Sequence, residues 1–282
     1  MSTLLNFFDP VLDIFRYPFM IRAYAVGTLV ALCASQIGIP LVIQRLSMIG
    51  DGLSHVAFGA IAVSLVLGQQ PLVVAVPVVL VAAFILLKLV PLTKRTGDRA
   101  IAMLSSGALA VGITTVSLTE GFNFDAESIL FGSILGLSDT DVWLTAGMTA
   151  LVVIPLIILA PLIFSLIFDP VFARVTGQPV KGLTTALAVM TALTVVTGMH
   201  IMGALLISSL LVFPASTALK VSSSYQEVLW RAALTSVLSV WIGLTVSYLW
   251  SVPAGAAIVL TNAAFYLLAL GVEAFRTKGR LS

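Results

Sequence analysis

Residues 141–167 read DVWLTAGMTALVVIPLIILAPLIFSLI, and after Asp141 this stretch contains no charged side chain. A helix needs about 20 consecutive apolar residues to cross the roughly 30 Å hydrocarbon core of a bilayer. The apolar residues here follow one another without the alternation that marks the strands of a membrane β-barrel. The stretch therefore predicts a membrane-spanning α-helix.

The rest of the chain has the same character. Of its 282 residues, 60% are hydrophobic and 9% are charged, whereas about 25% of the residues in a soluble domain are charged. The mean hydropathy is +1.14, and the formal net charge of +2 is too small to indicate a nucleic-acid partner. Cys33 is the only cysteine, so no intramolecular disulfide can form. Because no low-complexity linker divides the chain, we expect one transmembrane domain over residues 1–282.

Further apolar stretches predict an all-α fold, a polytopic bundle of transmembrane helices. The nine candidate spans are residues 20–43, 51–68, 71–90, 100–118, 141–167, 182–198, 200–219, 228–250 and 254–275. The sixth and seventh spans share a tight junction, and fusing them would reduce the number to eight. We therefore expect eight or nine spans.

The basic residues fall on alternate connections. Those of the expected inner connections and tail are Arg45, Lys94, Arg95, Arg99, Arg174, Lys181, Lys220, Arg231, Arg276, Lys278 and Arg280. The outer connections contain no Lys or Arg, as the positive-inside rule requires for a cytosolic C-terminus. Arg16 and Arg22 are the exceptions, since this orientation puts the N-terminus outside. Residues 1–19 include the amphipathic stretch LLNFFDPVLDIFRYPF and predict an interfacial helix.

The longest outer connection covers residues 119–140. It contains Glu120, Asp125 and Glu127, followed by the apolar patch ILFGSIL, which is too short to cross a bilayer. We interpret the patch as a short helix at the outer face. The three acidic side chains can gather cations or dock a partner, or they can simply be solvated.

Residues 168–181, FDPVFARVTGQPVK, predict a short helix on the inner side. Asp169 is a favourable N-cap, Pro170 suits the first helical position, and Gly177 is a natural stop. The roughly two turns between them are too short to cross a bilayer. The segment can be a docking element or a plain connector.

Asp51 and His55 are the strongest candidates for metal ligands. Ionisable residues inside a membrane are costly and mark functional sites, and residues four apart share one face of a helix. A carboxylate and an imidazole suit a divalent transition metal. Two ligands are too few for a closed site, but a two-fold dimer would supply four. The alternative is that Asp51 merely caps the N-terminus of its helix.

His200 is the only other histidine, and it is expected at the outer end of the seventh span. It can be an entry ligand for the metal or a side chain wetted at the interface. No G-x-x-x-x-G-K-[ST] motif occurs, so the chain has no P-loop for ATP hydrolysis. No nucleophile and base converge in the pattern either, and we do not expect an enzyme.

Four stretches, in order, resemble motifs of the permease subunits of bacterial zinc/manganese-type ABC importers. They are GDGLSHVAFG at 50–59, SILFGSILGLSDTDV at 128–142, FDPVFARVTG at 168–177 and MGALLISSLLVFPASTAL at 202–219. The resemblance implies a homodimer in the bacterial inner membrane that works with two cytosolic ATPase subunits and an extracytoplasmic metal-binding protein. It assigns Asp51 and His55 to the ion path, whereas His200 has no counterpart in the family pattern.

The resemblance also implies that the inner loop is the coupling element in contact with the ATPase. The loop residues it assigns to coupling are Asp169, Pro170, Phe172, Ala173, Arg174 and Gly177. The expected function is ATP-driven import of Zn²⁺ or Mn²⁺, with the binding protein docking at residues 119–127. The alternatives are a permease for a metal chelate or vitamin, and a metal transporter that needs no ATPase.

Overall fold

The computed structural model describes residues 16–89, 94–118, 132 and 136–281, and the side chains within these ranges except those of 87–98 and 276–281. Every regular element in this part of the chain is a helix. The helices are α2 (Pro18–Ile43), α3 (Met48–Val66), α4 (Pro71–Leu89), α5 (Lys94–Ser117), α7 (Asp139–Ile158), α8 (Ala160–Phe168), α9 (Pro170–Val175), α10 (Val180–Met202), α11 (Ala204–Val221), α12 (Tyr225–Trp250) and α13 (Ala254–Leu281).

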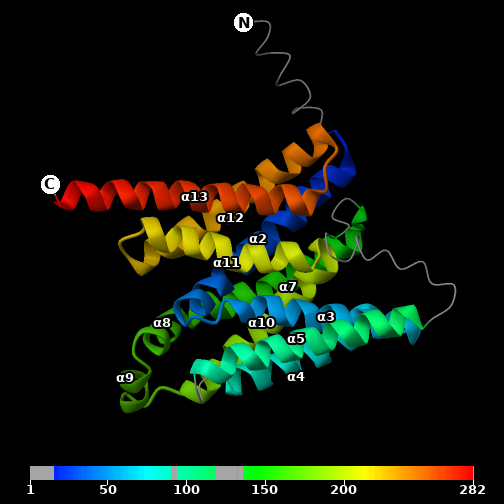
Figure 1. Ribbon diagram of the computed structural model, residues 1–282, viewed down its shortest axis with the longest axis horizontal. Helices are drawn as coiled ribbons and strands as arrows, with labels where there is room; N and C mark the ends of the chain where they lie inside the picture. The colour runs from blue at the N-terminus through cyan, green and yellow to red at the C-terminus, as the bar shows by residue number, and fades with distance from the viewer. Residues whose placement is uncertain (1–15, 90–93, 119–131, 133–135, 282) are drawn as a thin grey trace, which may run out of the picture.

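The predicted membrane bundle is confirmed. Among the described residues, eight helices are long and apolar enough to cross a bilayer, and α4 contains a shorter apolar helix, Pro71–Leu86. The chain passes back and forth along one axis (Figure 1). The α9 helix and the C-terminal end of α13 lie at one end, which we call the α9 end. The α10–α11 and α12–α13 turns lie at the other, which we call the Gly203 end.

Two details of the predicted spans change. Helices α10 and α11 are separate and antiparallel, joined at Gly203, whose φ of +86° is a conformation that glycine adopts without strain. Fusing these two spans was therefore wrong. The predicted span 141–167 is divided into α7 and α8 at Leu159, because Pro161 has no N–H to donate to the carbonyl one turn earlier.

Close contacts fix α3 between its neighbours. A Cβ at Gly59 would collide with the Ala108 carbonyl of α5, and one at Gly112 would lie 2.9 Å from the Gly59 Cα. Gly50 lies against Leu211 of α11. Small residues let helix backbones approach closely where no hydrophobic effect drives association in lipid. The position of α3 relative to α5 and α11 is therefore set by side-chain size.

Polar groups add fixed contacts between α2 and α12. The Tyr24 hydroxyl lies 2.8 Å from Thr245 Oγ1, and Ser236 Oγ donates to the Ala31 carbonyl at 3.0 Å. Such interhelical hydrogen bonds contribute about 0.6 kcal/mol each in a membrane protein. These hydrogen bonds hold α2 and α12 together as a pair that does not include the α3–α5 contact.

The three most exposed tryptophans lie near the ends of helices. Trp143 lies in the first turns of α7, Trp230 in the first turns of α12, and Trp250 is the last residue of α12, with exposed fractions of 79%, 74% and 72%. Tryptophan is enriched at the two membrane–water interfaces because its ring is apolar and its N–H is polar. The three rings therefore mark the limits of the apolar belt.

Candidate functional site

Asp51 and His55 lie one turn apart near the start of α3. The helix begins three residues before Asp51, with Ser47 as its N-cap, and no side chain caps it. The alternative that Asp51 is the N-cap is therefore wrong, although an acidic residue in a first helical turn is favoured by the helix dipole. Asp51 Oδ2 and His55 Nε2 are 3.7 Å apart, too far for a hydrogen bond.

The separation of these two atoms fits a shared ion. Two ligands at about 2.1 Å from a tetrahedral zinc ion lie about 3.4 Å apart. The His55 side chain is 24% exposed and that of Asp51 48%. His55 Nδ1 is buried and has no hydrogen-bond partner among the described residues, although buried polar atoms are normally paired. The imidazole is therefore not committed to a structural hydrogen bond at that nitrogen.

Asp51 lines a cavity of about 320 Å³ between α3, α11 and α13. The described residues that line it are Ser47, Met48, Asp51, Leu205, Ser208, Ser209, Val212, Phe213 and Val259. Asp51 is the only charged residue among them. Met48 and Leu205 beside it are exposed at 58% and 42%, so the cavity lies at an apolar surface of the chain.

One copy of the chain does not complete a metal site within the part that the structure describes. There, no three His, Cys, Asp or Glu side chains come together. Asp51 and His55 form a pair, and a structural zinc ion takes four ligands. Asp51 and His55 therefore supply two potential ligands.

The short helix predicted within residues 168–181 is α9, and its ends are built as predicted. Asp169 Oδ1 accepts from the backbone N–H groups of Val171 and Phe172 at 3.1 and 2.8 Å, and Pro170 is the first helical residue. Gly177, with φ of +77°, ends the segment. A capping carboxylate contributes about 1 kcal/mol to helix stability.

The faces of α9 differ sharply. Ala173 is fully buried, whereas Val171, Phe172 and Val175 are exposed at 70%, 57% and 81%. We call these three residues the α9 patch. Arg174 is also exposed. An apolar patch on a short helix at the end of the bundle is a surface that a protein partner can cover.

An aromatic cluster joins α8, the helix that precedes α9, to the start of α12. The rings of Phe164 and Phe168 on α8 are 4.6 Å apart, and the Tyr225 ring of α12 lies 5.0 Å from Phe164 and 6.3 Å from Phe168. Gln178 Nε2 donates to Ser165 Oγ at 3.3 Å. Through these contacts the segment that carries α9 is attached to the first turn of α12.

A model of the ABC 3 transport family matches residues 16–273, almost the whole chain. The chain belongs to the ABC 3 transport family. It is a multi-pass membrane component of a transporter, and the resemblance seen in the four sequence motifs is confirmed.

Relatives in the ABC 3 family cover the same length. The manganese transport system membrane protein MntC of Halalkalibacterium halodurans is 30% identical, covering 95% of this chain and 91% of MntC. The high-affinity zinc uptake system membrane protein ZnuB of Haemophilus influenzae is 28% identical over 90% of this chain and 97% of ZnuB. The solved structure of PsaBC from Streptococcus pneumoniae in complex with Fab matches with a TM-score of 0.82 and 29% identity, over 93% of this chain and 94% of that one.

His200 lies apart from Asp51 and His55, in the last turn of α10. We refer to Asp51 and His55 below as the metal pair. It interacts electrostatically with Asp141 in the first turn of α7. The Asp141 carboxylate accepts from the Ser138 N–H at 2.9 Å and the Asp141 N–H donates to Ser138 Oγ at 3.3 Å, which together form a capping box. Nearby, Arg22 pairs with Asp139 at 2.7 Å, which explains how a basic residue is accommodated at the Gly203 end.

Two predictions concern residues that the structure does not describe. Glu120, Asp125 and Glu127, with the short helix proposed at ILFGSIL, lie outside the described residues except for Gly132. Residues 1–15 of the predicted interfacial helix do so as well, and Pro18 and Phe19 belong to α2. The docking and interfacial roles stay predictions.

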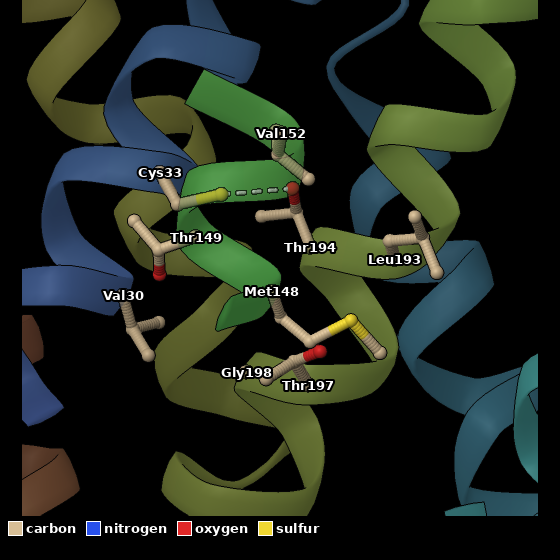
Figure 2. Close-up of a pocket in the computed structure, with 9 residues that line it drawn as sticks. All are labelled: Val30, Cys33, Met148, Thr149, Val152, Leu193, Thr194, Thr197 and Gly198. Atoms are coloured by element: carbon tan, nitrogen blue, oxygen red, sulfur yellow. Dashed lines mark hydrogen bonds between the residues drawn. The ribbon is translucent and has the colours of Figure 1, made fainter. Parts of the chain in front are cut away.

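A second, much smaller cavity lies in the core between α2, α7 and α10 (Figure 2). Its volume is about 10 Å³, roughly that of one water-sized probe. Cys33 Sγ lies 3.2 Å from Thr194 Oγ1 at its wall, and Thr197 Oγ1 is buried without a partner. This cavity is far too small to be a permeation path for a hydrated ion.

Sequence reasoning missed four residues that the structure brings to the two candidate functional surfaces. Val171 and Val175 complete the α9 patch, and the signal was present: apolar residues four apart on a short helix expected outside the bilayer. Ser208 and Ser209 line the Asp51 cavity. For these serines only the tertiary fold supplies the signal.

Proposed function

We propose that this chain is the membrane subunit of an ATP-driven importer of a divalent transition-metal ion, Mn²⁺ or Zn²⁺. The observation that carries the proposal is the Asp51–His55 pair, with Asp51 Oδ2 and His55 Nε2 3.7 Å apart and with Asp51 lining a cavity. Relatives named for manganese and zinc transport support the class of cargo. Carboxylate suits manganese and imidazole suits zinc, so the pair is compatible with both.

Two copies of the chain would form the pathway. Each copy presents the metal pair at a surface flanked by exposed Met48 and Leu205. Two such surfaces related by a two-fold axis would bring two carboxylates and two imidazoles together. An isologous interface of this kind is the commonest way in which identical subunits associate.

The metal pair must bind the ion without trapping it. A pathway site has to be favourable enough for entry and weak enough for release. Carboxylate and imidazole ligands on α3 meet this requirement better than thiolates, which hold zinc in closed structural sites. A neutral imidazole and an ionised carboxylate are the forms that ligate, so metal binding competes with protons.

ATP hydrolysis would take place in partner subunits, since this chain has no P-loop motif. The α9 patch is the proposed contact with them. The charged N-cap Asp169 and the buried Ala173 keep α9 rigid, so that movement of an ATPase subunit would displace α9 and α8 together. Tyr225 would pass that displacement to α12 through the aromatic cluster.

The proposed orientation follows from the partners. The α9 end, with the C-terminus, would face the cytosol of a bacterial cell, and the Gly203 end would face outward. An extracytoplasmic metal-binding protein would dock at the Gly203 end, with residues 119–127 as its acidic contact. The ion would then enter between the two copies and reach Asp51 and His55.

The test is metal uptake by cells in which the chain is replaced by Asp51→Ala or His55→Ala. Each variant is expected to lose most of the uptake of radioactive manganese or zinc while the full-length chain still assembles with its ATPase subunit. His200→Ala serves as the matched histidine control, because His200 is not part of the pair. Normal uptake by both pair variants would refute the role of these ligands. Failure of any ATPase to co-purify would refute the importer class.

A further inference from the structure

We infer that the ion beside Asp51 keeps part of its water shell, that Ser208 and Ser209 of α11 hold this water, and that Asn262 of α13 positions Ser209. The inference rests on the proposed function, because it concerns the metal that Asp51 would bind. It names the state of the cargo, a partly hydrated divalent cation, and three residues outside the Asp51–His55 pair.

The first support is the size of the cavity. At about 320 Å³ it is much larger than a bare metal ion, and a water molecule in the liquid occupies about 30 Å³. Helix α3 contributes Asp51 to its wall, and α11 contributes Ser208 and Ser209. Helix α11 packs against both α3 and α13. The charged group and the two hydroxyls therefore border one space that can contain an ion with several waters.

The second support is the hydrogen-bonding capacity that remains at the two hydroxyls. Ser208 Oγ donates to the Leu205 carbonyl at 3.1 Å, and Ser209 Oγ accepts from Asn262 Nδ2 at 3.3 Å. A serine hydroxyl has one donor and two acceptor positions, so each oxygen keeps at least one acceptor position. Water bound to a cation directs its hydrogens outward and therefore needs acceptors around it. The carboxylate and the two hydroxyls provide them.

The third support is the burial of Asn262. It lies in the apolar helix α13 and is 2% exposed, and polar residues in such helices are costly and tend to serve function. Asn262 does not line the cavity, but it holds Ser209, which is 6% exposed and does line it. Asn262 is thus a positioning residue that acts through the Ser209 hydroxyl.

Water retention has a consequence for selectivity. Manganese is typically bound through carboxylate, carbonyl and water oxygens, whereas zinc suits imidazole and readily becomes four-coordinate. Groups that hold metal-bound water should therefore favour manganese over zinc. A residue that only joins two helices would affect both ions equally.

The experiment measures uptake and competition between Mn²⁺ and Zn²⁺ in cells that carry the full-length variants. Ser208→Ala, Ser209→Ala and Asn262→Leu are each expected to lower the preference for manganese over zinc by about threefold or more, the scale of one hydrogen bond in a membrane protein. Ser209→Thr, which keeps a hydroxyl, should restore the preference. Ser236→Ala is the matched control, because it removes a buried interhelical hydrogen bond, to Ala31, that is remote from the cavity.

The inference is overturned if Ser209→Ala and Asn262→Leu leave the preference unchanged, or if Ser236→Ala shifts it by the same factor. The proposed function fails by a different result, namely normal uptake in Asp51→Ala and His55→Ala. If the pair variants lose uptake and the serine variants keep the preference, then the metal pair stands and only the hydration role is wrong.

Discussion

Gly59 on α3 packs directly against Ala108 on α5, so closely that a Cβ at Gly59 would overlap the Ala108 carbonyl oxygen. This contact lies one turn beyond His55 on the same helix. Asp51, His55 and Gly59 belong to the same helix, so a shift of α3 relative to α5 would also move Asp51 and His55. The packing of these two helices therefore determines where the two candidate ligands lie.

Gly59→Ala is expected to destabilise the protein and to reduce metal uptake. The added methyl would push the backbone of α3 away from that of α5. Overpacking of this kind lowers the free energy of unfolding by about 1–3 kcal/mol. The thermal midpoint of the purified chain in detergent measures the effect. Gly107→Ala on α5 is the matched control, because nothing lies within 4 Å of its Cβ position. There, replacing glycine in a helix should stabilise by about 0.5–1 kcal/mol. Equal midpoints for both variants would contradict the contact.

Val175→Glu is expected to weaken binding of the ATPase subunit. Burying one apolar side chain of this size contributes about 1.5–3 kcal/mol, so the affinity should fall by at least tenfold, measured by co-purification from membranes. Val175→Leu keeps the apolar surface and should bind normally. Ala173→Glu is not a useful test of docking, because Ala173 is fully buried and the variant would disrupt α9 itself. Undiminished co-purification of Val175→Glu would exclude the α9 patch as the contact.

Hydropathy predicted the helices well because a membrane span is a property of a continuous stretch. It placed the start of α3 at Asp51 instead of Met48, since it responds to the apolar run and not to Ser47 before it. It also missed the break at Leu159, because the proline that causes it lies inside an apolar run. Local backbone chemistry, not hydrophobicity, decides such boundaries.

The candidate site could be predicted only in part. Asp51 and His55 are four residues apart, so their proximity follows from helix geometry alone. That Asp51 and Ser209 border one cavity, and that Ser209 accepts from Asn262, depends on which helices are neighbours. An apolar pattern does not specify neighbours, because lipid and helix surfaces are equally apolar and small residues such as Gly50 and Gly59 permit several close pairings.

Thr197→Val is expected to leave the thermal midpoint unchanged or to raise it. The Thr197 hydroxyl is buried beside the small cavity of Figure 2 without a hydrogen-bond partner, and valine has the same shape without the polar group. An unpaired buried hydroxyl costs about 1–3 kcal/mol. Thr194→Val is the contrasting variant, because Thr194 pairs with Cys33 and with the Met190 carbonyl, and it should lower the midpoint. A lower midpoint for Thr197→Val would indicate that its hydroxyl has a partner.

Metal binding to the purified full-length chain is expected to weaken on acidification, because protons compete with the metal for imidazole and carboxylate ligands. Equilibrium dialysis with Mn²⁺ or Zn²⁺ measures the binding. His55→Gln should bind the metal weakly, whereas His200→Gln should bind it as the wild-type chain does, since His200 lies apart from Asp51 and His55. Loss of binding in His200→Gln together with normal binding in His55→Gln would move the metal site to the Gly203 end of the bundle.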